Sequence, residues 1–311
     1  MNSRSKNHLL TQTSFLILVV GPTAVGKTDL CLNLAKKFDT EILSSDSRQF
    51  YREMEIGTAK PSPEILNQVP HHFINSLSIW EDYDVKRFEQ DALKLLDQLF
   101  DKKKVVIMTG GSGLFADAIT EGLDEIPEIP KEFREEVIRD FEQKGLEFLQ
   151  EELARLDPKY FAQVDQKNPQ RLMRGIEVVR ATEKPFSSFR QKAKVNRPFQ
   201  TIKIGLYRDR AELYQRIDQR MDEMLNQGLA DEARNLFPFK HLNALQTVGY
   251  QEIFGYLEGN YSWDEAVRLL KRNSRRYAKR QLTWFRKDPE IQWFIPEQEA
   301  EIEEFIAAQI F

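Results

Sequence analysis

Residues 21–28 read G-P-T-A-V-G-K-T and follow directly on an apolar run, Phe15–Val20. This run has the length and composition of a buried β-strand, and the apolar spacing within Asp29–Phe38 predicts a helix. A G-x-x-x-x-G-K-[ST] segment between a strand and a helix is the phosphate-loop pattern. Its glycines let backbone N–H groups surround a phosphate, and the helix dipole favours the anion. The stretch therefore predicts a phosphate-binding α/β core.

The loop pattern predicts a di- or triphosphate ligand but does not specify the group that is transferred. Lys27 adds a point charge and the Thr28 hydroxyl can hold Mg²⁺. The alternative is a glycine turn that binds nothing. A GTPase is disfavoured because the chain has no D-x-x-G and no N-K-x-D segment, whereas a nucleotide or metabolite kinase remains open. The candidate diphosphate or nucleotide ligands are Gly21, Pro22, Thr23, Ala24, Val25, Gly26, Lys27 and Thr28.

Further strands and helices alternate along the chain, which predicts a parallel sheet with crossover helices. Glycines mark the ends of two predicted strands and place a site at the carboxyl edge of the sheet. The predicted strands are 15–20, 41–45, 104–109, 201–207 and 292–295, and the predicted helices of the core are 29–38, 85–100 and one that starts after 110–113.

A change of character at about Leu123 predicts a helical insertion. Charged helical stretches cover about 131–155 and 168–181, and no strand pattern returns before residue 201. Longer helices are predicted at 210–236, 243–257 and 263–287. The expected organisation is 1–122 as the first part of a P-loop NTPase-like α/β core, 123–198 as the helical insertion, and 199–311 as the return to the core plus C-terminal helices.

Composition and charge narrow the class of protein. The net charge is −4, but residues 271–287 hold eight bases and no acid, and residues 121–152 hold twelve acids against four bases. Segregated charge can give an acidic protein a basic face for a polyanion. The chain contains no run of about 20 apolar residues, so no membrane-spanning helix is predicted. The one cysteine, Cys31, excludes an internal disulfide and a cysteine-rich zinc site, so we expect a cytoplasmic protein.

A second polar segment, Ser45-Asp46-Ser47-Arg48-Gln49, follows the predicted strand 41–45. A carboxylate at this strand end can accept a proton, orient a substrate or hold a metal. A helix N-cap is an equally good reading of Asp46 taken in isolation. His71 and His72 have no ligand-spaced partners, so a zinc site there is disfavoured.

These segments together resemble the tRNA dimethylallyltransferases, also called tRNA isopentenyltransferases. The resemblance runs in family order over nearly the whole chain. The matching segments are G-P-T-A-V-G-K-T at 21–28, D-S-R-Q-F-Y-R-E-M-E-I-G-T-A-K-P at 46–61, G-G-S-G-L-F at 110–115, N-P-Q-R-L-M-R-G-I-E-V at 168–178, Y-Q-R-I-D-Q-R at 214–220, V-G-Y-Q-E at 248–252 and R-R-Y-A-K-R-Q-L-T-W-F-R at 275–286.

The resemblance implies transfer of a dimethylallyl group from dimethylallyl diphosphate to N6 of the adenosine 3′ of the anticodon in tRNA, with Mg²⁺ as cofactor. It implies catalytic roles for Asp46 as the proton acceptor, and for Lys27 and Arg220 at the diphosphate. It also implies binding of the anticodon stem-loop, and we expect the protein to be a monomer. The tRNA-contacting residues implied are Asp46, Ser47, Arg48, Gln49, Ser112, Arg134, Gln170, Arg171, Leu172, Met173 and Arg174.

Departures from the family pattern and other hypotheses also follow from the sequence. Ser112 stands where the family usually has Thr, and Phe115 where it usually has Tyr. The absence of a cysteine pattern for a zinc finger favours the bacterial type of the family.

A third hypothesis is an RNA-binding protein that keeps the fold but has no catalytic activity. The presence of Lys27 and Asp46 disfavours it. The arginines of helix 263–287 predict a polyanion face, against a solvated face or ion pairs as the alternatives.

Overall fold

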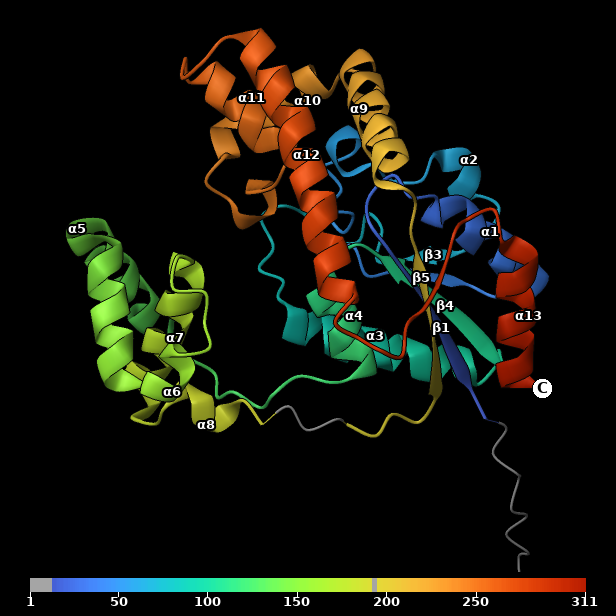
Figure 1. The fold of residues 1–311 in the computed structure, drawn as a ribbon, viewed down its shortest axis with the longest axis horizontal. Helices are drawn as coiled ribbons and strands as arrows, with labels where there is room; N and C mark the ends of the chain where they lie inside the picture. Colours follow the sequence, from blue (N-terminus) through green and yellow to red (C-terminus); the bar gives the residue numbers. More distant parts are fainter. Residues whose placement is uncertain (1–12, 192–194) are drawn as a thin grey trace, which may run out of the picture. The chain divides into compact units, whose positions relative to one another are not determined.

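The structure is a computed structural model that describes residues 13–191 and 195–311 (Figure 1). It divides into two compact units. The first comprises the described residues up to Thr120 together with Asn196–Phe311, and the second is Glu121–Val195. The predicted insertion was 123–198. In the described part of the chain, no helix is long and apolar enough to cross a membrane.

The first unit is built on a parallel sheet whose strands lie in the order β3-β2-β4-β1-β5-β6. β1 is central and pairs with β4 on one side and β5 on the other, Phe15 opposite Val105 and Gln200. This strand order confirms the predicted P-loop-like α/β core. The strands are β1 Phe15–Val20, β2 Ile42–Ser44, β3 His71–His72, β4 Val105–Gly110, β5 Gln200–Leu206 and β6 Gln292–Phe294.

Alternate residues of β1 pack into two different cores, because successive side chains of a strand point to opposite faces. Leu16 and Leu18 pack in the core of α3 (Val85–Phe100), α4 (Gly113–Thr120) and the C-terminal helices. Ile17 and Val19 pack in the core of α1 (Lys27–Lys37), α9 (Arg210–Asn226) and α13 (Glu299–Ile310). Burial on both faces explains why β1 is continuously apolar.

The C-terminal helices depart from the prediction at glycines with positive φ. The predicted helix 210–236 is wrong as one element, because Gly228 (φ 103°) ends α9 and begins α10, Leu229–Leu236. The predicted helix 243–257 is a short 3₁₀ turn, Asn243–Leu245, followed by Gly249 (φ 106°) and α11, Tyr250–Leu257. The predicted helix 263–287 is confirmed as α12, Trp263–Phe285.

The sequence analysis missed several short elements and one longer helix. β3 consists only of His71 and His72, too short for an alternation signal. α13 buries Ile302, Ile306 and Ile310, which lie four residues apart on one face, but no capping side chain marks its start. The other missed elements are the 3₁₀ turns Ile56–Thr58 (η1) and Phe237–Phe239, and the four-residue helices α2 (Pro63–Leu66), α6 (Pro158–Phe161) and α8 (Phe186–Phe189).

The second unit has its own small core. α7, Pro169–Thr182, packs against α5, Lys131–Leu156, through Leu172, Ile176, Leu149 and Leu153. The predicted single helix 131–155 is interrupted, because Gly145 (φ 79°) divides α5 into two helical segments. The pattern of the sequence alone therefore gave the helical character of this unit but missed its bend.

Candidate active site

The phosphate loop connects the end of β1 at Val20 to the start of α1 at Lys27. A Cβ at Gly21 would lie 2.7 Å from the carbonyl oxygen of Leu206, so the close approach of the backbone to β5 requires glycine there. Gly26, the residue before the helix, has φ 115°, which also favours glycine. Close packing at Gly21 and the positive φ of Gly26 therefore explain the two glycines of the motif. The N-terminus of α1, which follows Gly26, lines the cavity described below.

Lys27 lies inside the loop. Its Nζ donates hydrogen bonds to the carbonyl oxygens of Gly21 (3.0 Å) and Pro22 (2.8 Å). Burial lowers the pKa of the Lys27 ammonium to about 8; the Asp46 carboxylate opposes this shift and the Arg220 guanidinium adds to it. The loop therefore holds a cation that becomes partly neutral in mildly alkaline solution.

We expect the affinity for an organic diphosphate to fall as the pH rises through about 8, because only protonated Lys27 attracts the anion. The phosphate is already ionised there, since its second pKa lies near 6. Calorimetric titration with dimethylallyl diphosphate between pH 7 and 9.5 measures this. In Lys27→Met the decline should disappear, and an equal decline in that variant would mean that another group titrates.

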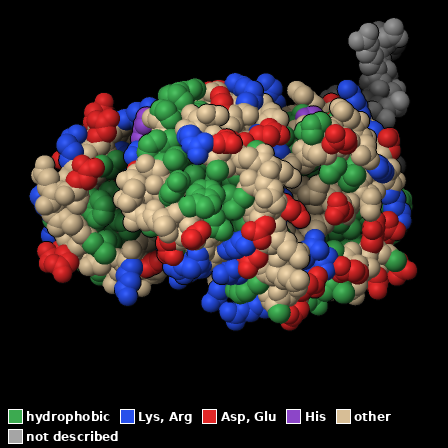
Figure 2. All heavy atoms as spheres, turned by 90° about the horizontal axis from the view of Figure 1, so that it is seen from above, with side chains coloured by type: hydrophobic (Ala, Val, Ile, Leu, Met, Phe, Trp, Pro, Cys, Tyr) green, Lys and Arg blue, Asp and Glu red, His purple; other side chains and the backbone are tan. Residues whose placement is uncertain are grey.

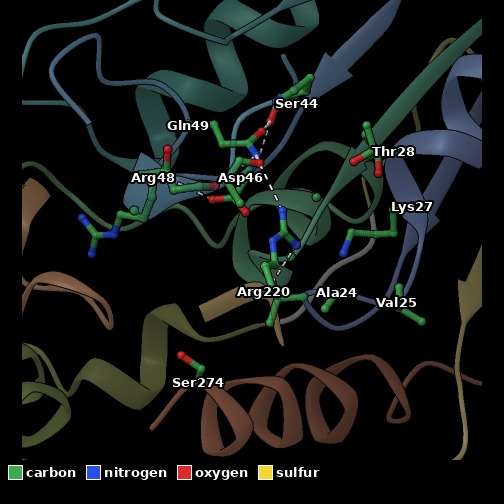
Figure 3. Close-up of a pocket in the computed structure, with 18 of the residues that line it drawn as sticks. Ala24, Val25, Lys27, Thr28, Ser44, Asp46, Arg48, Gln49, Arg220 and Ser274 are labelled. Atoms are coloured by element: carbon green, nitrogen blue, oxygen red, sulfur yellow. Dashed lines mark hydrogen bonds between the residues drawn. The ribbon is translucent and has the colours of Figure 1, made fainter. Parts of the chain in front are cut away.

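Asp46 lies after β2, at the carboxyl edge of the sheet. Its Oδ1 accepts the backbone N–H of Arg48 (3.0 Å), and its own N–H is bonded to the Ser44 hydroxyl (3.2 Å). The alternative reading as a helix N-cap is wrong, because residues 47–50 form turns and no helix begins there. Asp46 lines the same cavity as the phosphate loop (Figure 3).

Arg220 reaches the cavity from α9. Its guanidinium donates to the Thr23 hydroxyl (3.4 Å) and to the Ala59 carbonyl oxygen (3.4 Å). Burial lowers the pKa of the Arg220 guanidinium, and the nearby Asp46 carboxylate opposes this shift. In Figure 3 the guanidinium lies between the labelled side chains of Asp46 and Lys27.

One cavity of about 440 Å³ contains all three predicted catalytic groups, Asp46, Lys27 and Arg220, although they come from distant parts of the chain. The structure thus brings together the three catalytic residues that the resemblance implied. Thr28 lies at its edge with an exposed side chain. Other residues that line it are Thr23–Gly26, Arg48, Gln49, Thr58, Ala59, Arg216, Tyr277 and Gln281.

Gln281 and Tyr277 of α12 were not predicted as site residues. The Gln281 side chain accepts the Thr23 N–H (2.9 Å) and donates to the Gly111 carbonyl oxygen (2.9 Å), so it ties the phosphate loop to the loop after β4. Burial raises the pKa of Tyr277 to about 12, with Asp46 adding to the shift and a hydrogen bond with Ser112 opposing it. Both lie in the 275–286 motif, which was the available signal.

The predicted tRNA-contacting residues of the first unit form a connected group. The Ser112 hydroxyl is bonded to the Ser47 backbone N–H and hydroxyl (3.2 Å each), so Ser supplies the hydroxyl that Thr usually gives. Arg48 donates to the carbonyl oxygens of Asn243 and Ala244, and Gln49 reaches those of Thr58 and Ala59. The side chains of Ser112, Arg48 and Gln49 therefore also hold the neighbouring loops in place through these hydrogen bonds.

In the second unit, the predicted tRNA-contacting segment 170–174 lies in α7, and the helix places its residues on different faces. Gln170 and Arg171 are exposed and Arg174 is partly exposed, but Leu172 and Met173 are buried in the core of the unit. Five consecutive helical residues cannot share one face, so the side chains of Leu172 and Met173 are not available to RNA. Arg134 is bonded to Glu177 and Gln170, which orders it beside this surface.

The basic helix α12 carries both paired and exposed cations. Arg275 forms an ion pair with Asp218, so this arginine serves the fold as well. The exposed cations in the C-terminal half of the helix are Arg276, Lys279 and Arg280, and Arg286 and Lys287 follow directly after its end. The face in Figure 2 shows groups of Lys and Arg side chains interspersed with acidic ones rather than one uniformly basic surface.

Fold and site together define a phosphate-loop enzyme in which a carboxylate, Asp46, and an arginine, Arg220, line the same cavity as the loop. The family described as IPP transferase matches residues 49–288. The chain belongs to this family, which confirms the resemblance seen in the sequence.

Individual relatives are similar in sequence to this chain over nearly its full length. The chain is 54% identical to the tRNA dimethylallyltransferase of Cytophaga hutchinsonii, over 95% of this chain and 97% of the relative. It is 48% identical to tRNA dimethylallyltransferase 1 of Bacteroides fragilis, covering 95% and 98%.

Solved structures are also similar. The full-length tRNA isopentenylpyrophosphate transferase from Bacillus halodurans superposes with a TM-score of 0.70 at 36% identity, covering 96% of this chain and 97% of that one. A eukaryotic dimethylallyltransferase acting on tRNA has a TM-score of 0.78 at 23% identity, covering 95% and 80%, and supports the fold alone.

Proposed function

We propose that this protein transfers the dimethylallyl group of dimethylallyl diphosphate to N6 of adenosine 37, the nucleotide 3′ of the anticodon of tRNA. The products are N6-isopentenyladenosine and diphosphate. The observation that carries the proposal is the single cavity in which Asp46 and Arg220 face the phosphate loop. Family membership supports the choice of tRNA as acceptor.

The phosphate loop supplies the stabilisation that the leaving group needs. The exocyclic amine of adenine is a weak nucleophile, but the allylic C–O bond breaks readily once the departing diphosphate is stabilised. Loop N–H groups, Lys27 and Arg220 lie where they can surround it, and being fixed beforehand they need little reorganisation.

Asp46 accepts the proton that N6 loses as the new C–N bond forms. Its Oδ1 is held by the Arg48 N–H, which fixes the carboxylate in a turn at the edge of the cavity. The base has to leave its stack to reach this depth, and flipping a nucleotide of a single-stranded loop costs only a few kcal/mol.

The residues fit Mg²⁺ bound together with substrate. Thr28 offers one hydroxyl oxygen beside the loop, and Mg²⁺ commonly takes few protein ligands and completes its shell with phosphate oxygens and water. Bound there, the ion would neutralise charge on the diphosphate.

We also propose that the enzyme acts as a monomer in the cytoplasm, where its RNA substrate would be available.

The affinity for tRNA should fall steeply with salt, by about tenfold or more between 50 and 200 mM, because cations such as Arg276 and Arg280 displace counterions from phosphates. Filter binding across this range measures the slope. The double variant R276Q/R280Q should flatten it. Arg268→Gln, which removes an exposed arginine paired with Glu265 on the same helix, should not. A slope that is the same in all three proteins would contradict a role of this face.

A transfer assay tests the proposed reaction directly. The protein is incubated with Mg²⁺, radiolabelled dimethylallyl diphosphate and tRNA that lacks the modification, and the tRNA is then digested to nucleosides. Label in N6-isopentenyladenosine is the expected result. Absence of label with retained tRNA binding would contradict the proposal, and ATP turnover would then be measured to test the kinase alternative.

A further inference from the structure

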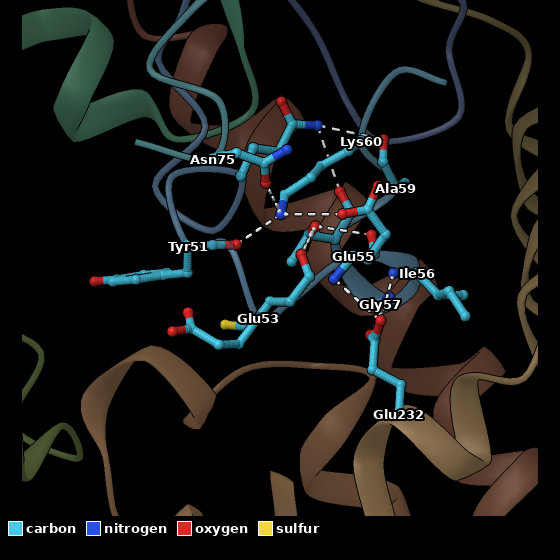
Figure 4. A network of polar contacts seen from close by, with 12 residues as sticks. Tyr51, Glu53, Glu55, Ile56, Gly57, Ala59, Lys60, Asn75 and Glu232 are labelled. Atoms are coloured by element: carbon cyan, nitrogen blue, oxygen red, sulfur yellow. Dashed lines mark hydrogen bonds and ion pairs between the residues drawn. The ribbon is translucent and has the colours of Figure 1, made fainter. Parts of the chain in front are cut away.

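Glu232 of α10 is not one of the predicted catalytic residues, but its carboxylate accepts hydrogen bonds from four donors. Oε2 accepts the backbone N–H groups of Glu55 (3.1 Å) and Ile56 (2.8 Å). Oε1 accepts the N–H of Gly57 (3.0 Å) and the hydroxyl of Tyr250 (2.7 Å). One carboxylate thus satisfies three consecutive N–H groups at the start of η1, where a negative charge is favoured (Figure 4).

Tyr250 and Gly57 fit together at this point. A Cβ at Gly57 would lie 2.5 Å from the Tyr250 ring, so only glycine allows the ring to pass beneath η1. Tyr250 is fully buried, and its hydroxyl is oriented by Glu232. This contact gives a structural reason for two motifs that the catalytic groups do not explain, G-T-A-K-P at 57–61 and V-G-Y-Q-E at 248–252.

The other end of the same segment is held by Lys60. Its buried Nζ donates to the Tyr51 carbonyl oxygen (2.6 Å) and to Asn75 Oδ1 (2.5 Å) (Figure 4). Between the two anchors Ala59 is held at φ 51°, an unfavourable conformation for a residue other than glycine. The chain is therefore fixed on both sides of a strained residue.

The Ala59 carbonyl oxygen links this clamped segment to the cavity. It accepts hydrogen bonds from Arg220 (3.4 Å) and from the Gln49 amide (3.3 Å). Among the residues that the structure describes, the Arg220 guanidinium has one other hydrogen-bond partner, the Thr23 hydroxyl of the phosphate loop. Displacing residues 55–59 would therefore release one of the two contacts that orient Arg220.

We propose that Glu232 is a positioning residue for prenyl transfer: through residues 55–59 it fixes the Ala59 carbonyl oxygen and so sets the Arg220 guanidinium toward the diphosphate. The inference rests on the proposed function for its effect on turnover. The placement of Arg220 itself does not depend on the identity of the acceptor.

A double-mutant cycle tests the link. E232A, R220A and the double variant are compared by kcat for transfer at saturating substrates, and by calorimetric affinity for inorganic diphosphate. E232A should lower kcat about tenfold and weaken diphosphate binding severalfold. In the R220A background the same change should alter either quantity by less than about twofold. E232Q, which keeps part of the acceptor set, should lie between E232A and the unmodified protein.

Asp84→Ala is the matched control for lost stability. The Asp84 carboxylate caps α3, where its Oδ1 accepts the Arg87 N–H (2.8 Å), so its removal lowers the stability of the fold. The variant should leave kcat and diphosphate affinity unchanged. If E232A does not fold, the cycle is run with E232Q, and Tyr250→Phe removes one bond to the carboxylate.

Independent effects of E232A and R220A, multiplying in the double variant, would overturn the inference. If the unmodified protein binds diphosphate but transfers nothing, the proposed function fails. The binding arm of the cycle still decides whether Glu232 acts through Arg220.

Discussion

Asp46→Ala is expected to lower kcat for prenyl transfer by about 10²–10⁴-fold, the usual contribution of a positioned proton acceptor. N6 of adenine must lose its proton as the C–N bond forms, and Asp46 is the carboxylate that faces the phosphate loop in the cavity. The affinity for tRNA should change little, because the other contacts of the RNA remain. Single-turnover rates and filter binding on the same preparations measure both quantities.

Asp46→Asn separates chemistry from structure. The amide can keep its Oδ1 as acceptor for the Arg48 N–H, so the turn after β2 is retained while the proton acceptor is lost. We expect its rate to be as low as that of Asp46→Ala, with a melting temperature nearer to that of the unmodified protein. Transfer at the normal rate by either variant would exclude Asp46 as the acceptor.

Much of the core could be predicted because its signals are local. The strand, glycine loop and helix at 15–37 lie together in the sequence, and burial of both faces of β1 made the strand continuously apolar. The resemblance of motifs then gave Asp46 and Arg220. The parallel sheet brings the phosphate loop and Asp46 together, because both follow the carboxyl ends of strands at one edge. Arg220 is added to their cavity from α9.

The parts that could not be predicted depend on contacts between distant residues. A helical pattern continues through Gly228, and only the observed φ of 103° shows that α9 ends there. Gln281 would be an ordinary polar residue of a basic helix were it not bonded to Thr23 and Gly111. Leu172 and Met173 resembled a contact segment, and the packing of α7 against α5 assigned them to a core.

Arg220→Ala should lower kcat by about 10²–10³-fold, the range seen when one donor to a developing charge is removed. The guanidinium is held between the Thr23 hydroxyl and the Ala59 carbonyl oxygen, and it is desolvated, so its interaction with the departing diphosphate is little screened. The KM for dimethylallyl diphosphate should change less than kcat, because negative charge on the leaving group is greatest in the transition state.

Arg220→Lys tests whether shape matters in addition to charge. A single ammonium cannot reach both Thr23 and Ala59 as the planar guanidinium does, so the lysine should recover at most a small part of the rate. Steady-state kinetics of the two variants, with Arg210→Ala as an exposed arginine control on the same helix, measure this. Full activity of Arg220→Lys would show that a point charge suffices, and the argument for a fixed guanidinium, with Glu232 behind it, would then lose its basis.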